Sequence, residues 1–249
     1  MNKRNTILLL AALSACLVST NPLRAQDSIA DAAASAPAGL YPAGSPAAMM
    51  LAGHNSRAVW ENFPGFTADL VVITDSASHS TKLRVESDFE YSYQLPADAD
   101  EPWVDAKLRS VISHRRPDDA PAYDVVFLDH NETSPIGRLI GQRNGSGEFR
   151  IQDGVIREVH RKSETSWMEI TNVEQFKTTN GQFLPETTSV TFRDPGTGNL
   201  KSNGSNRFTW TQVGDFYLPE SSFTVQVGVD GEREIRELHF SNHKLLPAE

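Results

Sequence analysis

Three dipeptides that favour tight hairpins divide the second half of the chain into pieces of strand length. They are Asp153-Gly154, Asn180-Gly181 and Asp230-Gly231. Residues of these types adopt the positive φ angles that two-residue hairpin turns require. The stretches between them are rich in β-branched and aromatic residues, and a longer turn over 194–199 adds a further break. The pattern predicts successive antiparallel hairpins, which together make a meander sheet.

Apolar and polar residues alternate along two of the predicted strands near the carboxyl terminus. Successive side chains of a strand point to opposite faces of its sheet. We therefore expect the apolar residues of each strand on a buried face and the polar residues in water. The first apolar set is Phe223, Val225, Val227 and Val229, and the second is Phe208 and Trp210.

Two helices are predicted before the meander. Ser45-Pro46 and Glu101-Pro102 are typical helix starts, with apolar residues at helical spacing behind each. The first helix is expected to run to Trp60 and the second to 114–116. Between them the sequence predicts strands over 68–74, 81–86 and 89–95. The expected fold is mainly β (α+β): a curved antiparallel meander sheet or half-barrel with two helices packed on one face.

The amino terminus resembles a secretory signal. Lys3 and Arg4 form a basic start, and an uncharged apolar run over 7–15 follows that is too short to span a bilayer. This predicts a signal peptide over 1–25, a flexible Ala/Ser/Pro/Gly-rich linker over 26–45 and a single β-rich domain over 46–249. The protein is expected to be exported, as a periplasmic protein, a cell-envelope lipoprotein or a secreted protein.

Cys16 leaves two processing routes open. Cleavage after Ala25 removes the only cysteine and gives a mature chain without thiols or disulfides. Alternatively, Leu13-Ser14-Ala15-Cys16 looks like the bacterial lipoprotein pattern, in which Cys16 carries the lipids. A membrane is an expected partner only through that lipid anchor.

Charge argues against a nucleic-acid partner. The full chain has a formal net charge of −9, and loss of residues 1–25 leaves 20 basic and 32 acidic residues, a net charge of about −12. Nucleic-acid binding usually needs a basic excess or stripe, which this sequence lacks.

No catalytic motif, metal site or cofactor site is predicted. The seven histidines have none of the spacings of known zinc motifs, and no nucleophile elbow or phosphate-binding loop is present. An enzyme or metalloprotein that uses His114, His130 or His160 is the third of three hypotheses for function.

Aromatic residues supply the leading hypothesis. If the sheet curves around the helices, large aromatic side chains can line an apolar pocket between the two layers, although core packing is their more usual role. The hypothesis is a non-enzymatic protein that binds an apolar or amphipathic ligand, such as a lipid or lipoprotein. The alternative is a ligand-free envelope scaffold or interaction module. The candidate ligand-binding residues are Trp60, Phe63, Phe66, Trp103, Trp167 and Trp210.

Several short motifs are spread over the predicted domain. They are Arg57-Ala58-x-Trp60, Phe63-Pro64-Gly65-Phe66, Leu108-Arg109-x-Val111 before His114-Arg115, Gly154-x-Ile156-Arg157-x-Val159-His160-Arg161, Phe192-Arg193-Asp194-Pro195 and Phe240-Ser241-Asn242. Together they resemble a bacterial family, the domain of unknown function family 3386. That resemblance implies no activity, cofactor or site residue. At the level of fold, the order of elements is also similar to that of periplasmic lipoprotein carriers, which implies a sheet wrapped around helices and an apolar cavity.

Overall fold

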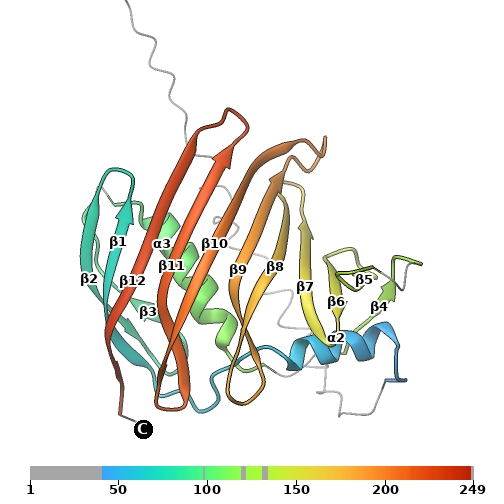
Figure 1. Cartoon of the computed structure of the whole chain (residues 1–249), viewed down its shortest axis with the longest axis horizontal. Coiled ribbons are helices and arrows are strands. Elements are labelled where there is room, and N and C mark those ends of the chain that lie inside the picture. Colours follow the sequence, from blue (N-terminus) through green and yellow to red (C-terminus); the bar gives the residue numbers. More distant parts are fainter. Residues whose placement is uncertain (1–40, 98, 119–121, 131–133, 248–249) are drawn as a thin grey trace, which may run out of the picture. The chain divides into compact units, whose positions relative to one another are not determined.

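The computed structural model of the chain describes residues 41–97, 99–118, 122–130 and 134–247. The predicted signal peptide, including Cys16, and most of the predicted linker lie outside these residues. In chain order the described elements (Figure 1) are α2 (Pro46–Asn55), β1 (Phe66–Thr74), β2 (Ser78–Val85), β3 (Tyr91–Ser92), α3 (Glu101–Ile112), η2 (Ser113–Arg115), β4 (Val125–Phe127), β5 (Arg138–Gln142), β6 (Glu148–Gln152), β7 (Val155–Lys162), β8 (Trp167–Lys177), β9 (Phe183–Arg193), β10 (Leu200–Val213), β11 (Phe216–Gly228) and β12 (Arg233–Leu245).

The described strands form one sheet with the order β3-β2-β1-β12-β11-β10-β9-β8-β7-β6-β5-β4. From β4 to β12 each strand pairs antiparallel with the next one along the chain. β1 pairs with both β2 and β12, so the first hairpin joins the sheet beside the last strand. β3 and β4 are the two edges of the sheet as described. The predicted mainly β, antiparallel meander with two helices is confirmed.

Both predicted helices form. Ser45 caps the first as predicted, and the second begins at Glu101 of the predicted pair, with Asp100 as its cap. The Ser45 hydroxyl accepts a hydrogen bond from the Ala48 amide at 3.2 Å. The Asp100 carboxylate accepts one from the Trp103 amide at 3.4 Å. Such caps satisfy amide groups that the first turn of a helix leaves unpaired.

The prediction that the first helix reaches Trp60 is wrong, because α2 ends at Asn55. The next residues leave the helix to pair with the start of β9. The Phe183 amide donates to the Ser56 carbonyl at 2.8 Å, and the Ala58 amide donates to the Phe183 carbonyl at 2.9 Å. A long-range strand contact therefore replaces the last helical turn that local spacing predicts.

The third predicted strand is also shorter than expected. β3 covers only Tyr91–Ser92, whereas the sequence predicts a strand over 89–95. The φ angle of Phe89 is +69°, in the left-handed region that interrupts a strand. Its side chain turns into the core, where it is 7% exposed.

Both helices pack on the same face of the sheet, which we call the inner face. Val159 of β7 packs against the core beneath α2, and its partner across the strand pair is Ile170 of β8. Ile170 pairs with Val190, and Val190 with Gly204 of β10. Directly paired residues point to the same face. Two residues beyond Gly204, Asn206 accepts a hydrogen bond from α3, so α3 lies on this face as well.

Two separate apolar cores hold the helices to the sheet. α3 lies behind β10, β11 and β12 in Figure 1, and its buried residues join those of β1, β2 and the 60–66 loop. The smaller core joins α2 to β4–β7. The buried residues of α3 are Trp103, Val104, Leu108, Val111 and Ile112, and those of the smaller core are Met50, Val125, Ile140, Phe149 and Ile151.

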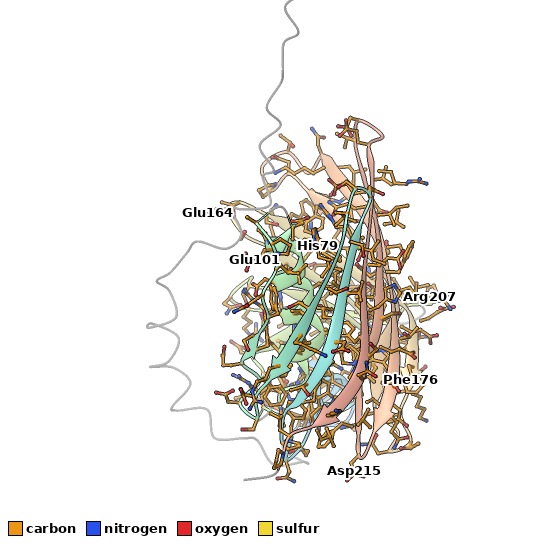
Figure 2. All side chains as sticks on the ribbon, turned by 90° about the vertical axis from the view of Figure 1, so that its left-hand side faces the viewer. His79, Glu101, Glu164, Phe176, Arg207 and Asp215 are labelled. Atoms are coloured by element: carbon orange, nitrogen blue, oxygen red, sulfur yellow. The ribbon has the colours of Figure 1, made fainter. Side chains whose placement is uncertain are left out.

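The predicted orientation of β11 is wrong. Phe223 and Val227 are 38% and 39% exposed, and Val229 beyond the strand is 69% exposed, whereas Ser222 and Thr224 are buried. The alternation therefore exists, but its apolar side lies on the outer face. Figure 2 agrees, because Arg207 of β10, the partner of Phe223, points away from the face that carries α3. On β10 the prediction is confirmed, since Phe208 is 5% exposed and Trp210 packs against the core beneath α3.

Candidate functional site

Four of the six predicted aromatic residues lie together in the core beneath α3. Trp60, Phe63, Phe66 and Trp103 are at most 6% exposed. The ring of Trp60 lies 4.7 Å from that of Phe63, measured between centroids, and 6.3 Å from that of Phe66. The indole N–H of Trp60 donates to the Tyr217 carbonyl at 3.2 Å. These side chains fill the space between helix and sheet with one another.

The other two predicted residues, Trp210 and Trp167, lie in different surroundings. Trp210 packs against the same core, and its indole N–H donates to the Pro185 carbonyl at 2.8 Å. Trp167 starts β8 and stands apart from both cores, with the ammonium of Lys162 over its ring at 4.7 Å. The ligand-binding role of all six remains a prediction.

Between the two cores lies a set of apolar residues that we call the inner-face strip: Met168, Ile170, Val190 and Phe192 of β8 and β9. Met168 pairs with Phe192, and Ile170 pairs with Val190. All of them share the face of Val159 and are only partly buried. They belong to neither core. Within the described residues, the strip is thus apolar inner-face surface that no helix seals.

The outer face of the same strands is polar, as expected for a wetted surface. Glu158 pairs with Thr171, and His160 pairs with Glu169. A chain of ion pairs runs over this face, in which Arg150 contacts Glu158 at 3.1 Å. The strip is therefore the apolar side of a normally alternating sheet, the side that a globular protein usually covers.

One end of the strip meets a polar network beneath α3. The Lys107 ammonium donates to Oδ1 of Asn206 at 2.6 Å. The Asn206 amide donates to the Thr188 hydroxyl at 3.1 Å, and the Thr224 hydroxyl donates to Oδ1 of Asn206 at 2.9 Å. Asn206, Thr188 and Thr224 are buried. We call these four residues the lysine network.

Lys107 carries a charge that no carboxylate balances among the described residues. Its ammonium lies 6.0 Å from the ring of Trp103 and 5.8 Å from that of Phe208, measured to the centroids. Desolvation, with a contribution from the charge of Arg236, lowers the pKa of Lys107 to about 8. Arg236 itself pairs with Asp100 at 3.0 Å and with Glu234. Lys107 is therefore mostly protonated at neutral pH and lacks an ion pair.

A second cation without an ion pair among the described residues lies in η2, directly after α3. Arg115 is 5% exposed, and in the described part of the chain its Nε and Nη1 atoms have no hydrogen-bond partner. Desolvation lowers its pKa to about 9. Neighbouring His114 reaches solvent, yet desolvation and the charge of Arg115 lower its pKa to about 4, so its ring is neutral at pH 7. The inner side of α3 thus presents positive charge in a protein of negative net charge.

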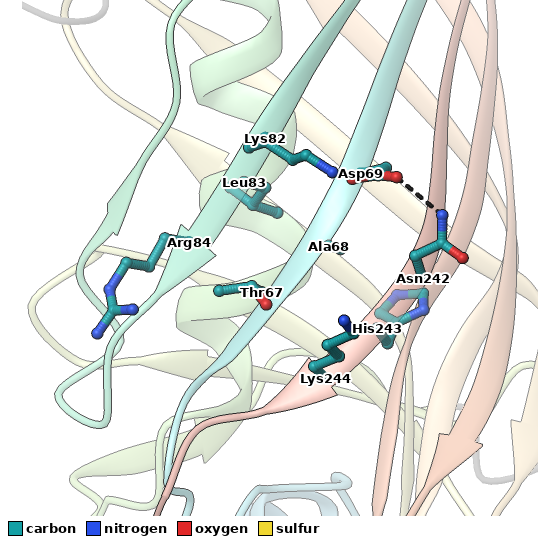
Figure 3. Close-up of a pocket in the computed structure, with 9 residues that line it drawn as sticks. All are labelled: Thr67, Ala68, Asp69, Lys82, Leu83, Arg84, Asn242, His243 and Lys244. Carbon is teal, nitrogen blue, oxygen red and sulfur yellow. Dashed lines mark hydrogen bonds and ion pairs between the residues drawn. The ribbon is translucent and has the colours of Figure 1, made fainter.

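An open depression of about 700 Å³ lies on the outer face of β1, β2 and β12 (Figure 3). Asp69 at its centre forms an ion pair with Lys82 and accepts a hydrogen bond from the Asn242 amide at 2.8 Å. The hydrogen bonds from Lys82 and Asn242 lower the pKa of Asp69. Arg84, at the other side of the depression, pairs with Glu86. Asp69, Lys82 and Arg84 thus have partners on the protein, so these charges offer a weaker site than the inner face.

The three candidate histidines stand in different settings. His160 contacts Glu148 and Glu158 on the outer face, both at 3.3 Å. His114 belongs to η2 on the inner side, and His130 follows β4. No three His, Cys, Asp or Glu residues gather into a metal-binding group in the described ranges.

Sequence reasoning missed both the lysine network and the inner-face strip. A usable signal for Lys107 was its position four residues after Trp103 and four before Val111, on the apolar side of the predicted helix. A charged residue there is a buried polar group that needs a partner. For the strip, the alternation over 168–171 was visible, but its lack of cover was not.

Comparison with known proteins gives a family and distant structural likenesses. A family model described as "Protein of unknown function (DUF3386)" matches residues 43–246. No curated protein matches the sequence. Among solved structures, a LolA superfamily protein from Nitrosomonas europaea is 12% identical, with a TM-score of 0.33, over 83% of this chain and 96% of that one. An outer-membrane lipoprotein-sorting-like protein domain from Vibrio parahaemolyticus is 12% identical, with a TM-score of 0.28, over 79% and 90%.

Proposed function

Since the chain belongs to the DUF3386 family, whose description gives no activity, we propose from its own residues that it binds the apolar part of an amphipathic ligand on the inner-face strip. The supporting observation is that Met168, Ile170, Val190 and Phe192 form paired apolar surface outside both cores. Contiguous apolar surface that is left partly exposed commonly marks a binding site.

The inner-face strip contains none of the six aromatic residues that the sequence singles out. Trp60, Phe63 and Phe66 already pack against one another, so a ligand among them would have to displace core side chains. Binding on the strip needs no such displacement. It would cover the apolar side chains that the two helices leave partly exposed.

Titration with a fluorescent fatty acid tests this proposal through a matched pair of variants. Val190→Glu places a charge in the strip, whereas Val227→Glu places the same charge on the outer face, at a valine that is 39% exposed. Because a carboxylate opposes burial of an acyl chain, Val190→Glu should weaken uptake at least about tenfold. Val227→Glu should match the wild type. No uptake by the wild type, or equal uptake by both variants, would contradict binding at the strip.

A ligand-free envelope scaffold or interaction module is the second candidate. One observation favours it, namely that the space beneath both helices is filled by core residues. The same titration separates the two functions, because a scaffold would take up no fatty acid in any variant.

We further infer that the protein acts outside the cytoplasm. This rests on the amino-terminal sequence, since residues 1–40 lie outside the described ranges. No helix in the described part of the chain is both long and apolar enough to cross a bilayer. Metabolic labelling with palmitate should mark the wild type and not Cys16→Ala if Cys16 carries lipids. An unlabelled wild type would instead favour cleavage after Ala25 and a mature chain without cysteine.

A further inference from the structure

Lys107 lies beside the inner-face strip, as the pairing of residues between neighbouring strands shows. Asn206, which accepts from Lys107, pairs with Thr188, and Thr188 pairs with Asn172 of β8. Val190 lies two residues further along β9, a rise of about 7 Å in an extended strand. Both residues point to the inner face. The network therefore borders the strip directly, on adjacent levels of one surface.

The hydrogen-bonding capacity of the ammonium is only partly used. Lys107 has three N–H donors, and within the described residues its only hydrogen bond goes to a neutral amide oxygen. The rings of Trp103 and Phe208 give it weaker electrostatic contacts. A buried charge is normally paired, because desolvation penalises an isolated ion. The side chain is still partly exposed, so an anion can reach it.

Arg115 is a poorer contact for a ligand than Lys107. It is 5% exposed and lies against Trp210, 5.9 Å from the ring centroid. Trp210 lies on β10 four residues after Asn206, in the direction that leads away from the strip. An anion at Arg115 would have to enter packed protein, whereas an anion at Lys107 would sit where the network meets the strip.

We propose that the protein binds a long-chain fatty acid, with the carboxylate paired to Lys107 and the acyl chain along the inner-face strip. The strip spans two neighbouring strands, which lie about 5 Å apart, so its width suits a single acyl chain. One unpaired ammonium suits one carboxylate. This inference rests on the proposed function, to which it adds the chemistry of the head group.

Lys107→Met tests the role of the charge when binding of a dansyl-labelled fatty acid is compared with that of its methyl ester. In the wild type at pH 7 the acid should bind about tenfold more tightly than the ester, because a charge-assisted contact is lost with the ester. Lys107→Met should bind both equally. Lys107→Arg keeps the charge and should keep a preference for the acid. Lys82→Met removes the same charge from the outer face and should behave as the wild type.

The outcomes separate this inference from the proposed function. If neither probe binds the wild type, binding at the strip itself fails. Equal binding of acid and ester to the wild type would overturn the role of Lys107, while the strip would still bind apolar chains. The same holds if Lys107→Met keeps the preference for the acid and circular dichroism shows that this variant is folded. Tight binding of a two-chain phospholipid without uptake of the fatty acid would overturn the assignment to a single chain.

Discussion

Replacement of Trp60 by alanine is expected to lower the free energy of unfolding by about 3–5 kcal/mol, the usual range for loss of a buried tryptophan. The side chain is 3% exposed and packs against Phe63, Phe66 and Phe89. Its removal leaves a cavity beneath α3 and takes the indole donor away from the Tyr217 carbonyl. Denaturant unfolding followed by circular dichroism measures the change.

Trp167→Ala is the matched control for this substitution. Trp167 belongs to neither core and lies between the cationic groups of Lys162 and Arg193. Its replacement should lower stability by only about 1 kcal/mol. If the Trp60→Ala protein were as stable as the wild type, the Trp60 side chain would not contribute to core packing. That result would favour the predicted ligand-binding role of Trp60.

The second large effect is a pH-dependent gain in stability from Lys107→Met. In the folded wild type the pKa of Lys107 is about 8, and in the unfolded chain it is near 10.5. Between these values the unfolded chain binds more protons, so the stability of the wild type rises with pH. Below about pH 8 the buried charge opposes folding in full, by up to about 3 kcal/mol. Lys107→Met removes this penalty.

The difference in stability between Lys107→Met and the wild type should therefore be largest at or below pH 8 and shrink toward pH 10. Arg236 is the charged group that acts on Lys107, and it is retained in the variant. Tyr93 and Tyr123, whose pKa values burial raises to about 12, affect both proteins equally. Urea unfolding at pH 7, 8, 9 and 10 gives the comparison. A difference independent of pH would show that Lys107 is not desolvated in the folded protein.

The parts of the fold that follow from local chemistry were predictable from the sequence. Gly154, Gly181 and Gly231 all have positive φ angles, as the hairpin dipeptides require. α3 begins at Glu101, as the predicted Glu101-Pro102 start requires. Each of these signals acts within a few residues, so no knowledge of the rest of the chain is needed to interpret it.

Features that depend on distant partners were not predictable. Alternation along β11 specifies two faces but not which one is covered. The lysine network lies on the inner face and buries Thr224, whereas Phe223 is 38% exposed on the outer face. Similarly, a tryptophan in the sequence does not indicate whether it fills a core, as Trp60 does, or stands apart from one, as Trp167 does. The inner-face strip exists because neither of the two apolar cores extends over β8. This lack of cover is a property of the assembled sheet and its helices.

Methyl nuclear magnetic resonance with an added long-chain fatty acid tests binding at the strip most directly. The methyl resonances of Met168, Ile170 and Val190 are expected to shift and to show contacts with the acyl chain. Ile140 and Ile151, which are fully buried in the core beneath α2, should not shift. Shifts confined to residues around Trp60 or to Val227 on the outer face, or no shifts at all, would contradict a ligand site on the inner face of β8 and β9.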